Sequence, residues 1–364
     1  MIPSPDRRFV IIAEGMFGGD ASKTARGVIK YSSSPTNAVI DSTKAGRTVG
    51  DVIGHLASGG HVDIPIVATL AEALAIEPRA TTLVIGVAPA GGKLSPAWRS
   101  TVTEALEQGL DVVNGLHMFL SDDPEFTAAA ERGGARIYDF RRPPERMEVA
   151  TGRDHLPGRK VILTVGTDCA SGKMGVSMEL TRAAREAGLS AALVPTGQTG
   201  MMIEGWGVAI DRVAADFLQG TVEWLTEQAE QGADWVVVEG QGSLDHFAYS
   251  SVTLALIHAS RPHGMVMVHQ AGRESHHAFE HCGKLSRMRS LEQHIEAHET
   301  VAALVEPSTV VAIALNTSFY PDDDEARRVI AETEARTGLP TDDPYRFGPG
   351  PLFARIREAV EALA

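Results

Sequence analysis

A glycine-bounded loop in the middle of the chain has the residue types and spacing of a phosphate-binding site. The apolar run VILTVG at residues 161–166 leads into TDCASGKM, and a segment with a helical pattern follows. A loop of this kind between a strand and a helix turns backbone N–H groups toward one concavity, and Lys173 adds a positive charge. We therefore predict a phosphate-containing cofactor bound by Gly166, Thr167, Asp168, Cys169, Ala170, Ser171, Gly172, Lys173 and Met174.

The loop departs from the standard NTPase pattern in two ways. Five residues, rather than four, separate Gly166 from the Gly-Lys pair, and Met174 stands where a Ser or Thr hydroxyl would bind Mg²⁺. Cleavage of a terminal phosphate requires charge neutralisation by a well-placed Mg²⁺. The sequence therefore favours a loop that holds a phosphate without breaking it, although Thr167 or Asp168 could supply another oxygen.

Polar residues that follow apolar runs are the next candidates for chemistry. Glu239 ends the run WVVV and precedes GQGS, and a carboxylate at this point can position a metal or water, or act as a general base for an amine. Arg273 follows MVMVHQ and can bind a carboxylate or phosphate through two N–H groups. We predict Glu239, His246 and Arg273 as the catalytic group.

Further residues at strand ends are predicted to complete the site. Asn316 ends the run VVAIALN and is assigned to the cofactor. The predicted substrate-binding residues, which lie in SKT, PTGQTG, GQGS and the segments after them, are Lys23, Thr196, Gln198, Thr199, Gln241, Ser243, Tyr249 and His269.

Histidine and cysteine spacing does not indicate a metal site. His276, His277 and His281 lie near Cys282, but no Cys-x-x-Cys pair accompanies them. We therefore predict no metal. Cys169 is interpreted as a small packing residue in the loop, since no histidine lies near it in sequence.

The chemistry-bearing residues require two α/β halves to position them. Apolar runs at residues 9–15, 37–43, 64–70, 81–89, 111–115 and 135–140 alternate with amphipathic segments, and residues 161–166, 191–194, 235–238, 265–270 and 310–316 continue the series. Such alternation predicts mainly parallel sheets with helices on both faces. We expect a Rossmann-like domain at 1–142, a proline-rich linker at 143–159 and a P-loop NTPase-like domain at 160–364.

One feature of the first half imitates a dinucleotide site. Asp41 ends the second apolar run, where an acid binds a ribose in Rossmann proteins, and Gly15, Gly18 and Gly19 follow the first run. The glycines lack the G-x-G-x-x-G spacing, so the sequence predicts the fold rather than a nicotinamide cofactor.

Composition narrows the class of protein. The formal net charge of -14 over 364 residues argues against a surface for nucleic acid or acidic membrane. The two cysteines are too few for a disulfide framework, and the first residues lack the apolar core of a signal peptide. We expect a cytoplasmic homo-oligomer that acts on a small molecule, with no nucleic-acid or membrane partner.

The assembled motifs resemble two known families. GTDCASGKM and VVVEGQG are similar to the phosphate loop and acidic strand end of dethiobiotin synthetase. Along nearly the whole chain, AEGMFGGDASKTARGVIKYS, AVIDSTKAG, GLHMFLSDDP, VPTGQTG, VEGQGSLDHFAYSSVTLALIHAS and ALNTS resemble the DUF1611 family. That resemblance implies a Rossmann-like domain followed by a P-loop domain.

The resemblance also implies an activity. Some DUF1611 members are D-glutamate N-acetyltransferases, which move acetyl from acetyl-CoA to the amine of D-glutamate. In this chain the loop at 166–173 would then hold coenzyme A phosphates, and Glu239 or a histidine would take the amine proton. The alternatives are an ATP- and Mg²⁺-dependent ligase of the dethiobiotin synthetase type, and a nucleotide-binding protein without catalysis.

Overall fold

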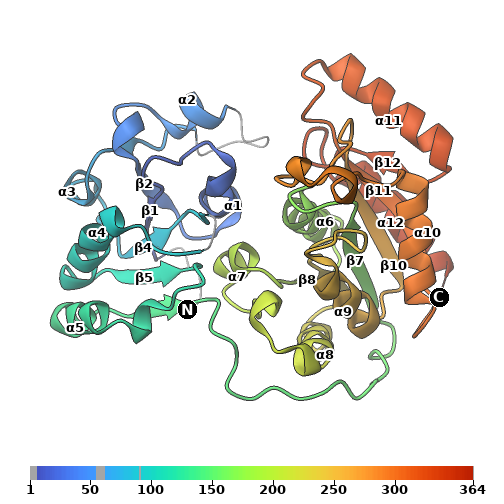
Figure 1. The fold of residues 1–364 in the computed structure, drawn as a ribbon, viewed down its shortest axis with the longest axis horizontal. Coiled ribbons are helices and arrows are strands. Elements are labelled where there is room, and N and C mark those ends of the chain that lie inside the picture. The colour runs from blue at the N-terminus through green and yellow to red at the C-terminus, as the bar shows by residue number, and fades with distance from the viewer. Residues whose placement is uncertain (1–5, 55–61, 90–91, 364) are drawn as a thin grey trace. The chain divides into compact units, whose positions relative to one another are not determined.

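The computed structural model describes residues 6–54, 62–89 and 92–363. The chain divides into two compact units (Figure 1). The first contains residues 1–143 and 198–212, and the second contains residues 144–197 and 213–364. Each unit is built on its own six-stranded sheet.

The sheet of the first unit is parallel, with strand order β3-β2-β1-β4-β5-β6. Four of its strands consist of residues that are mostly buried and apolar, as expected of a sheet covered on both faces. Its strands are β1 (Phe9–Ile12), β2 (Thr36–Ile40), β3 (Ile66–Val67), β4 (Thr82–Ile85), β5 (Asp111–Asn114) and β6 (Ile137–Asp139).

Among the described residues of the first part of the chain, five helices accompany this sheet. They are α1 (Lys23–Tyr31), α2 (Val49–Ile53), α3 (Leu70–Leu74), α4 (Pro96–Glu107) and α5 (Pro124–Gly133). Helix α4 begins with a proline in its first turn, where the missing N–H costs no helical hydrogen bond.

A sixth helix of the first unit, α7 (Gln198–Glu204), comes from the second half of the sequence. Thr199 Oγ1 lies 2.9 Å from Thr24 Oγ1, and Arg141 donates to Gln198 Oε1 at 2.7 Å. These contacts explain why residues 198–212 belong to the first unit, whereas the expected range 160–364 places them in the second domain.

The sheet of the second unit is also parallel, with strand order β12-β11-β10-β7-β9-β8. Its strands are β7 (Lys160–Gly166), β8 (Ala191–Val194), β9 (Trp235–Val238), β10 (Gly264–Gln270), β11 (Val310–Asn316) and β12 (Thr341–Asp342). Its helices are α6 (Lys173–Glu186), α8 (Leu218–Glu230), α9 (Ser250–Ser260), α10 (Leu291–Ala302), α11 (Asp323–Thr337) and α12 (Gly350–Ala362).

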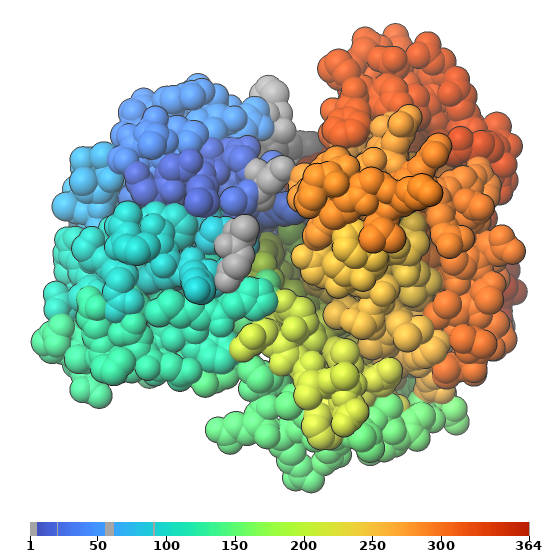
Figure 2. Space-filling model, viewed as in Figure 1, coloured from blue at the N-terminus to red at the C-terminus, as the bar shows by residue number. Residues whose placement is uncertain are grey.

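Short 3-10 turns complete the described structure. They cover Asp20–Ser22, Ser42–Lys44, Leu120–Asp122, Ile210–Arg212, Ala215–Phe217 and Glu280–Leu285. The last of these turns belongs to the segment between β10 and α10, much of which is exposed on the surface of the second unit (Figure 2).

The predicted fold class is confirmed: two parallel six-stranded sheets with helices form a two-domain α/β protein.

Residues 143–159, expected to be a linker, contain no helix or strand, and they run along α8. A Cβ on Gly220 of α8 would lie 1.9 Å from the carbonyl oxygen of Glu148, so the chain passes too close for any side chain there. None of the helices in the described parts of the chain is long and apolar enough to cross a membrane.

Candidate active site

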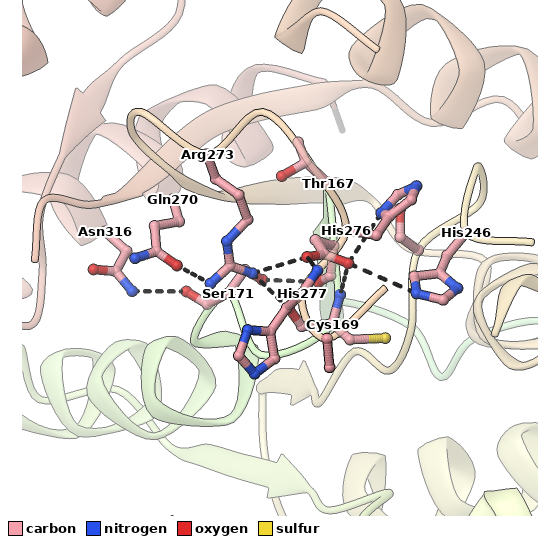
Figure 3. Close-up of polar contacts among 12 residues, drawn as sticks. Thr167, Cys169, Ser171, His246, Gln270, Arg273, His276, His277 and Asn316 are labelled. Carbon is pink, nitrogen blue, oxygen red and sulfur yellow. Dashed lines mark hydrogen bonds and ion pairs between the residues drawn. The ribbon is translucent and has the colours of Figure 1, made fainter. Parts of the chain in front are cut away.

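The phosphate loop connects the buried strand β7 to the first turn of α6 (Figure 3). Gly172 caps α6 with φ = 117°, a conformation that glycine adopts readily. Ala170 also has a positive φ, 54°, which is unusual for a residue with a side chain and is typical of strained functional loops. The loop therefore has the local geometry of an anion site at a helix N-terminus.

Lys173 folds back over its own loop. Its Nζ donates to the carbonyl oxygen of Asp168 at 2.6 Å and to Ser171 Oγ at 3.4 Å. A Cβ on Gly166 would lie 3.0 Å from this Nζ, so glycine leaves room for the lysine. Asn316 at the end of β11 donates to the carbonyl oxygen of Ser171 at 3.2 Å. The structure thus brings the predicted loop residues and Asn316 together.

Asp168 is the centre of a hydrogen-bond network that the sequence does not reveal. Its fully buried carboxylate accepts the backbone N–H of Cys169 at 2.7 Å and that of His277 at 2.8 Å. Arg273 Nη1 lies 2.9 Å and His276 Nδ1 lies 3.1 Å from the same carboxylate. Burial acts to raise the pKa of Asp168, but these hydrogen bonds and the Arg273 charge outweigh it and lower the pKa.

Arg273 reaches the loop from the segment after β10. Its Nη1 also donates to the carbonyl oxygen of Cys169 at 2.9 Å, and its Nη2 donates to Gln270 Oε1. Gln270 in turn donates to Ser318 Oγ at 3.1 Å. The guanidinium is therefore fixed beside the phosphate loop, as Figure 3 shows.

Asp168, His246 and His276 form a cluster with the composition of a metal site. One ligand atom from each lies within 4.8 Å of the others. However, Nδ1 of His246 accepts the backbone N–H of Ala248 at 3.1 Å, so the neutral ring carries its proton on Nε2. That Nε2 faces Asp168 Oδ1 at 4.0 Å and is buried without a hydrogen-bond partner among the described residues. An N–H group cannot ligate a metal, so the hydrogen bond from Ala248 opposes metal binding here.

The same hydrogen bond bears on the predicted catalytic role of His246. Burial, and next the charge of His276, lower the pKa of His246, which favours the neutral ring. In that ring Nε2 is a donor and Nδ1 is occupied by Ala248. His246 in this arrangement therefore offers no free lone pair to an amine proton.

Two further buried histidines extend the network on the α10 side. His294 Nε2 lies 3.3 Å from Asp245 Oδ2, and Ser243 Oγ donates to Asp245 Oδ1 at 2.8 Å. His298 Nδ1 lies 2.7 Å from the carbonyl oxygen of His294, and burial lowers the pKa of His298 to about 4. Burial also lowers the pKa of His294, so both histidines on α10 favour the neutral ring.

His269 lies on the other side of the loop. Its Nδ1 is 2.9 Å from Thr167 Oγ1, and burial lowers its pKa to about 4. This predicted substrate residue is placed to orient the Thr167 hydroxyl.

Glu239 follows β9 and is 3% exposed. Its Oε2 accepts the backbone N–H groups of Thr196 at 3.0 Å and Gly197 at 3.2 Å. Burial raises the pKa of Glu239 to about 7, although these two N–H groups and the charge of Lys173 act to lower it. A carboxyl with this pKa exchanges a proton near neutral pH, as a general base must.

Other predicted residues surround Glu239 or lie beside the histidines. Gln241 Nε2 donates to Thr196 Oγ1 at 3.3 Å, and Thr196 Oγ1 donates to the carbonyl oxygen of Glu239 at 2.8 Å. Tyr249 is the N-cap residue of α9, and its ring centroid lies 4.8 Å from that of His246.

Three predicted substrate residues belong to the first unit instead. Lys23 is exposed at the start of α1. Gln198 accepts a hydrogen bond from Arg141, and the hydroxyl of Thr199 contacts that of Thr24, within the same unit.

Asp41, at the position of a ribose-binding acid, also lies in the first unit. Its buried carboxylate accepts the N–H groups of Gly15 and Phe17 at 3.1 Å. It pairs with Lys44 Nζ at 2.9 Å as well, so its role is to close the turn after β2 rather than to bind a ribose.

Sequence reasoning missed several members of the network, namely Asp245, Gln270, His276, His277, His294 and His298. His277 acts through its backbone N–H, which leaves no signal in the side-chain pattern. Asp245 could have been found, because it lies in the same post-strand segment as Ser243 and His246.

Comparisons with known proteins place the chain in a family. Residues 148–353 match the model described as "Domain of unknown function (DUF1611_C) P-loop domain", and residues 42–143 match "Domain of unknown function (DUF1611_N) Rossmann-like domain". A crystal structure of a DUF1611 family protein from Anabaena variabilis superposes with a TM-score of 0.88 at 36% identity, covering 97% of this chain and 100% of that chain.

Two curated relatives have printed activities. A D-glutamate N-acetyltransferase from Tritonibacter scottomollicae is 38% identical over 305 residues, covering 81% of this chain and 84% of the relative. A D-glutamate N-acetyltransferase from a Pseudoalteromonas species is 37% identical over 279 residues, covering 76% and 81% respectively. By its sequence, its two domains and its structural similarity, the chain belongs to the DUF1611 family.

Proposed function

We propose that this protein is an acetyl-CoA-dependent N-acetyltransferase that converts D-glutamate to N-acetyl-D-glutamate. The observation that carries the proposal is the similarity to two D-glutamate N-acetyltransferases, at 37–38% identity over about four fifths of each chain. The site provides the chemistry that such a reaction needs, namely a phosphate loop and a carboxyl that titrates near neutral pH.

The phosphate loop suits coenzyme A, whose phosphates have only to be held. Met174 offers no hydroxyl to a Mg²⁺ ion. The acid at the end of β9, Glu239, already accepts two backbone N–H groups through one oxygen, and its raised pKa indicates an environment that disfavours negative charge. Both features favour binding of a phosphate over Mg²⁺-dependent cleavage.

Glu239 is the residue that we assign as the base. An α-amine is mostly protonated at neutral pH, and only the neutral amine attacks a thioester. After the ammonium group has released one proton to solvent, the carboxylate takes a second proton from the amine as nitrogen bonds to the acetyl carbonyl carbon. The carbon–sulfur bond then breaks, and coenzyme A leaves as a thiolate that acquires a proton, so acetyl is exchanged for hydrogen on nitrogen.

Arg273 and Lys173 supply positive charge at the loop. Lys173 is 7% exposed and Arg273 is held by three protein groups, so both cations are held in place before a ligand arrives. Cations held in place in this way favour anionic ligands such as the phosphates of coenzyme A.

The direct test is release of free coenzyme A by the purified protein with acetyl-CoA and D-glutamate, followed with a thiol reagent, with N-acetyl-D-glutamate identified by mass spectrometry. L-glutamate and D-alanine serve as matched acceptors that change only chirality or the side-chain carboxylate. Release that requires D-glutamate supports the proposal, whereas absence of release with every acceptor contradicts it.

The phosphate loop also motivates the alternative of an ATP-dependent ligase. A ligase of this kind would form ADP only in the presence of Mg²⁺, and EDTA would stop the reaction. Coenzyme A release that continues in EDTA separates the two activities in a single preparation.

A further inference from the structure

Asp168 places a negative charge inside a loop that has the geometry of an anion site. Its carboxylate is fully buried, and its pKa is lowered, so the charge is present at neutral pH. A buried negative charge beside a phosphate is repulsive unless a cation compensates it. Arg273 Nη1, 2.9 Å from Asp168 Oδ2, is that cation.

The carboxylate of Asp168 has no capacity left for a ligand. Oδ1 receives the N–H of Cys169 and faces His276 Nδ1, and Oδ2 receives Arg273 and the N–H of His277. Four donors fill the acceptor positions of a carboxylate. Asp168 therefore acts on a ligand through the groups that it holds.

Arg273 is the group through which Asp168 can act. A guanidinium has five N–H donors, and hydrogen bonds to Asp168, Cys169 and Gln270 engage three of them within the described structure. These three partners fix the plane of the guanidinium at the edge of the loop, leaving two N–H groups for a phosphate oxygen. Pre-organised forks of this kind bind phosphate without the entropy loss of ordering a free side chain.

A metal ion, which could otherwise compensate the negative charge of bound phosphates, is disfavoured near the loop. The residue after Lys173 is a methionine, and Glu239 is committed to two backbone N–H groups. At the cluster of Asp168, His246 and His276, the proton on His246 Nε2 opposes a metal ion. Lys173 and Arg273 are therefore left to compensate the charge of a bound polyphosphate.

We propose that Asp168 is a positioning residue whose carboxylate fixes Arg273 at the edge of the phosphate loop, so that Arg273 and Lys173 bind the ligand's phosphates without a divalent cation. The inference rests on the proposed function for the identity of the ligand, coenzyme A. Its physical content, phosphate binding without metal through a positioned arginine, is testable with a simpler anion.

The experiment is calorimetric titration of the EDTA-treated full-length protein with coenzyme A and, separately, with inorganic pyrophosphate. The wild type is expected to bind both, and added Mg²⁺ or Zn²⁺ is expected to leave the protein's affinity for coenzyme A unchanged. Asp168→Asn is expected to weaken binding of both ligands roughly 10- to 100-fold, because the hydrogen bond that Arg273 donates to residue 168 loses its charged acceptor. Arg273→Gln is expected to do the same.

A double-mutant cycle separates positioning from an independent effect. If Asp168 acts through Arg273, the double variant Asp168→Asn/Arg273→Gln binds no more weakly than Arg273→Gln alone. Losses that multiply in the double variant would show that Asp168 acts separately. Arg273→Lys should not restore affinity, because an ammonium cannot bridge three partners and a phosphate in one plane.

Kinetics distinguish positioning from general destabilisation. Asp168→Asn should raise KM for acetyl-CoA at least about tenfold while leaving KM for the acceptor unchanged, whereas partial unfolding lowers kcat alone. Asp41→Asn is the matched control, because Asp41 is equally buried and accepts comparable hydrogen bonds in the first unit. It should lower stability without changing KM for acetyl-CoA.

The other possible binding results test the inference and the proposed function separately. Binding that appears only with Mg²⁺ or Zn²⁺, or an Asp168→Asn variant that binds like the wild type, overturns the inference. Pyrophosphate binding without coenzyme A binding contradicts the proposed function while leaving the inference intact. Failure of the wild type to bind either ligand overturns both.

Discussion

Oε2 of Glu239 accepts the backbone N–H of Thr196 at 3.0 Å, and this contact joins the end of β9 to the segment after β8. The neighbouring N–H of Gly197 adds a second bond to the same oxygen. Burial raises the pKa of the Glu239 carboxyl, whereas the two N–H donors stabilise the charged form and act to lower the pKa. The balance is a pKa of about 7, which makes Glu239 suited to proton transfer at neutral pH.

The first prediction concerns the pH dependence of activity. Deprotonation of the free amine makes kcat/KM for D-glutamate rise at alkaline pH. Because Glu239 must be ionised to take a proton from the amine, it should add a separate rise through about pH 7. Glu239→Gln should lower kcat by roughly 100-fold or more and abolish this rise. The measurement is initial coenzyme A release over a pH series at saturating acetyl-CoA. An unchanged pH profile in Glu239→Gln would assign the base elsewhere.

The second prediction concerns the stability of the same variant. The ordinary pKa of 4.5 rises to about 7 in the folded state, so folding favours the protonated form. Glu239 therefore contributes stability that is fully present below its ordinary pKa and is lost as pH rises through about 7. A glutamine is neutral throughout. The stability of Glu239→Gln relative to the wild type should increase by roughly 3 kcal/mol between acidic and alkaline pH, measured by urea unfolding.

Much of the site follows from sequence because parallel strands bring their carboxyl ends to one edge of a sheet. The strand–loop–helix pattern predicts the phosphate loop. The expectation that polar residues after parallel strands converge on one site predicts Glu239, Arg273, His269 and Asn316. The structure places all four in one unit. These inferences need only the order of elements, which hydrophobic patterning reveals.

The remaining features depend on tertiary contacts that local patterns do not encode. The pairing of Asp168 with His276 joins residues 108 positions apart. The proton position on His246 depends on one backbone N–H, that of Ala248. Helix α7 belongs to the first unit because Thr199 and Gln198 find partners there, although its sequence continues directly from Gly197 beside Glu239.

The third prediction tests how closely Glu239 must be positioned. A Cβ on Gly197 would lie 2.5 Å from Gln241 Nε2 and 3.3 Å from Glu239 Oε1. The glutamine can move, so Gly197→Ala should fold, but the displaced Gln241 and Glu239 should lower kcat roughly 10- to 100-fold. Gly350→Ala is the control, because nothing lies within 4 Å of the added methyl group. Equal activity in both variants would contradict the assigned geometry.

The last prediction concerns the segment that runs along α8. His155 Nδ1 pairs with the buried Glu230, and His155 Nε2 lies 3.0 Å from the carbonyl oxygen of Arg261. Both ring nitrogens face acceptors, so the doubly protonated ring satisfies both contacts. Burial acts to lower the pKa of His155, but Glu230 outweighs it and raises the pKa above its ordinary value of 6.5.

A raised histidine pKa fixes the sign of the effect on stability. The contribution is fully present below the ordinary pKa of 6.5 and is lost as pH rises through the higher folded value. Comparison of wild type with His155→Gln by urea unfolding cancels the titration of other groups, including Glu239. The wild type should be more stable than the variant at about pH 6, and the difference should shrink by about pH 9. A difference that grows with pH would show that His155 is neutral in the folded protein, and that Glu230 does not hold this segment through an ion pair.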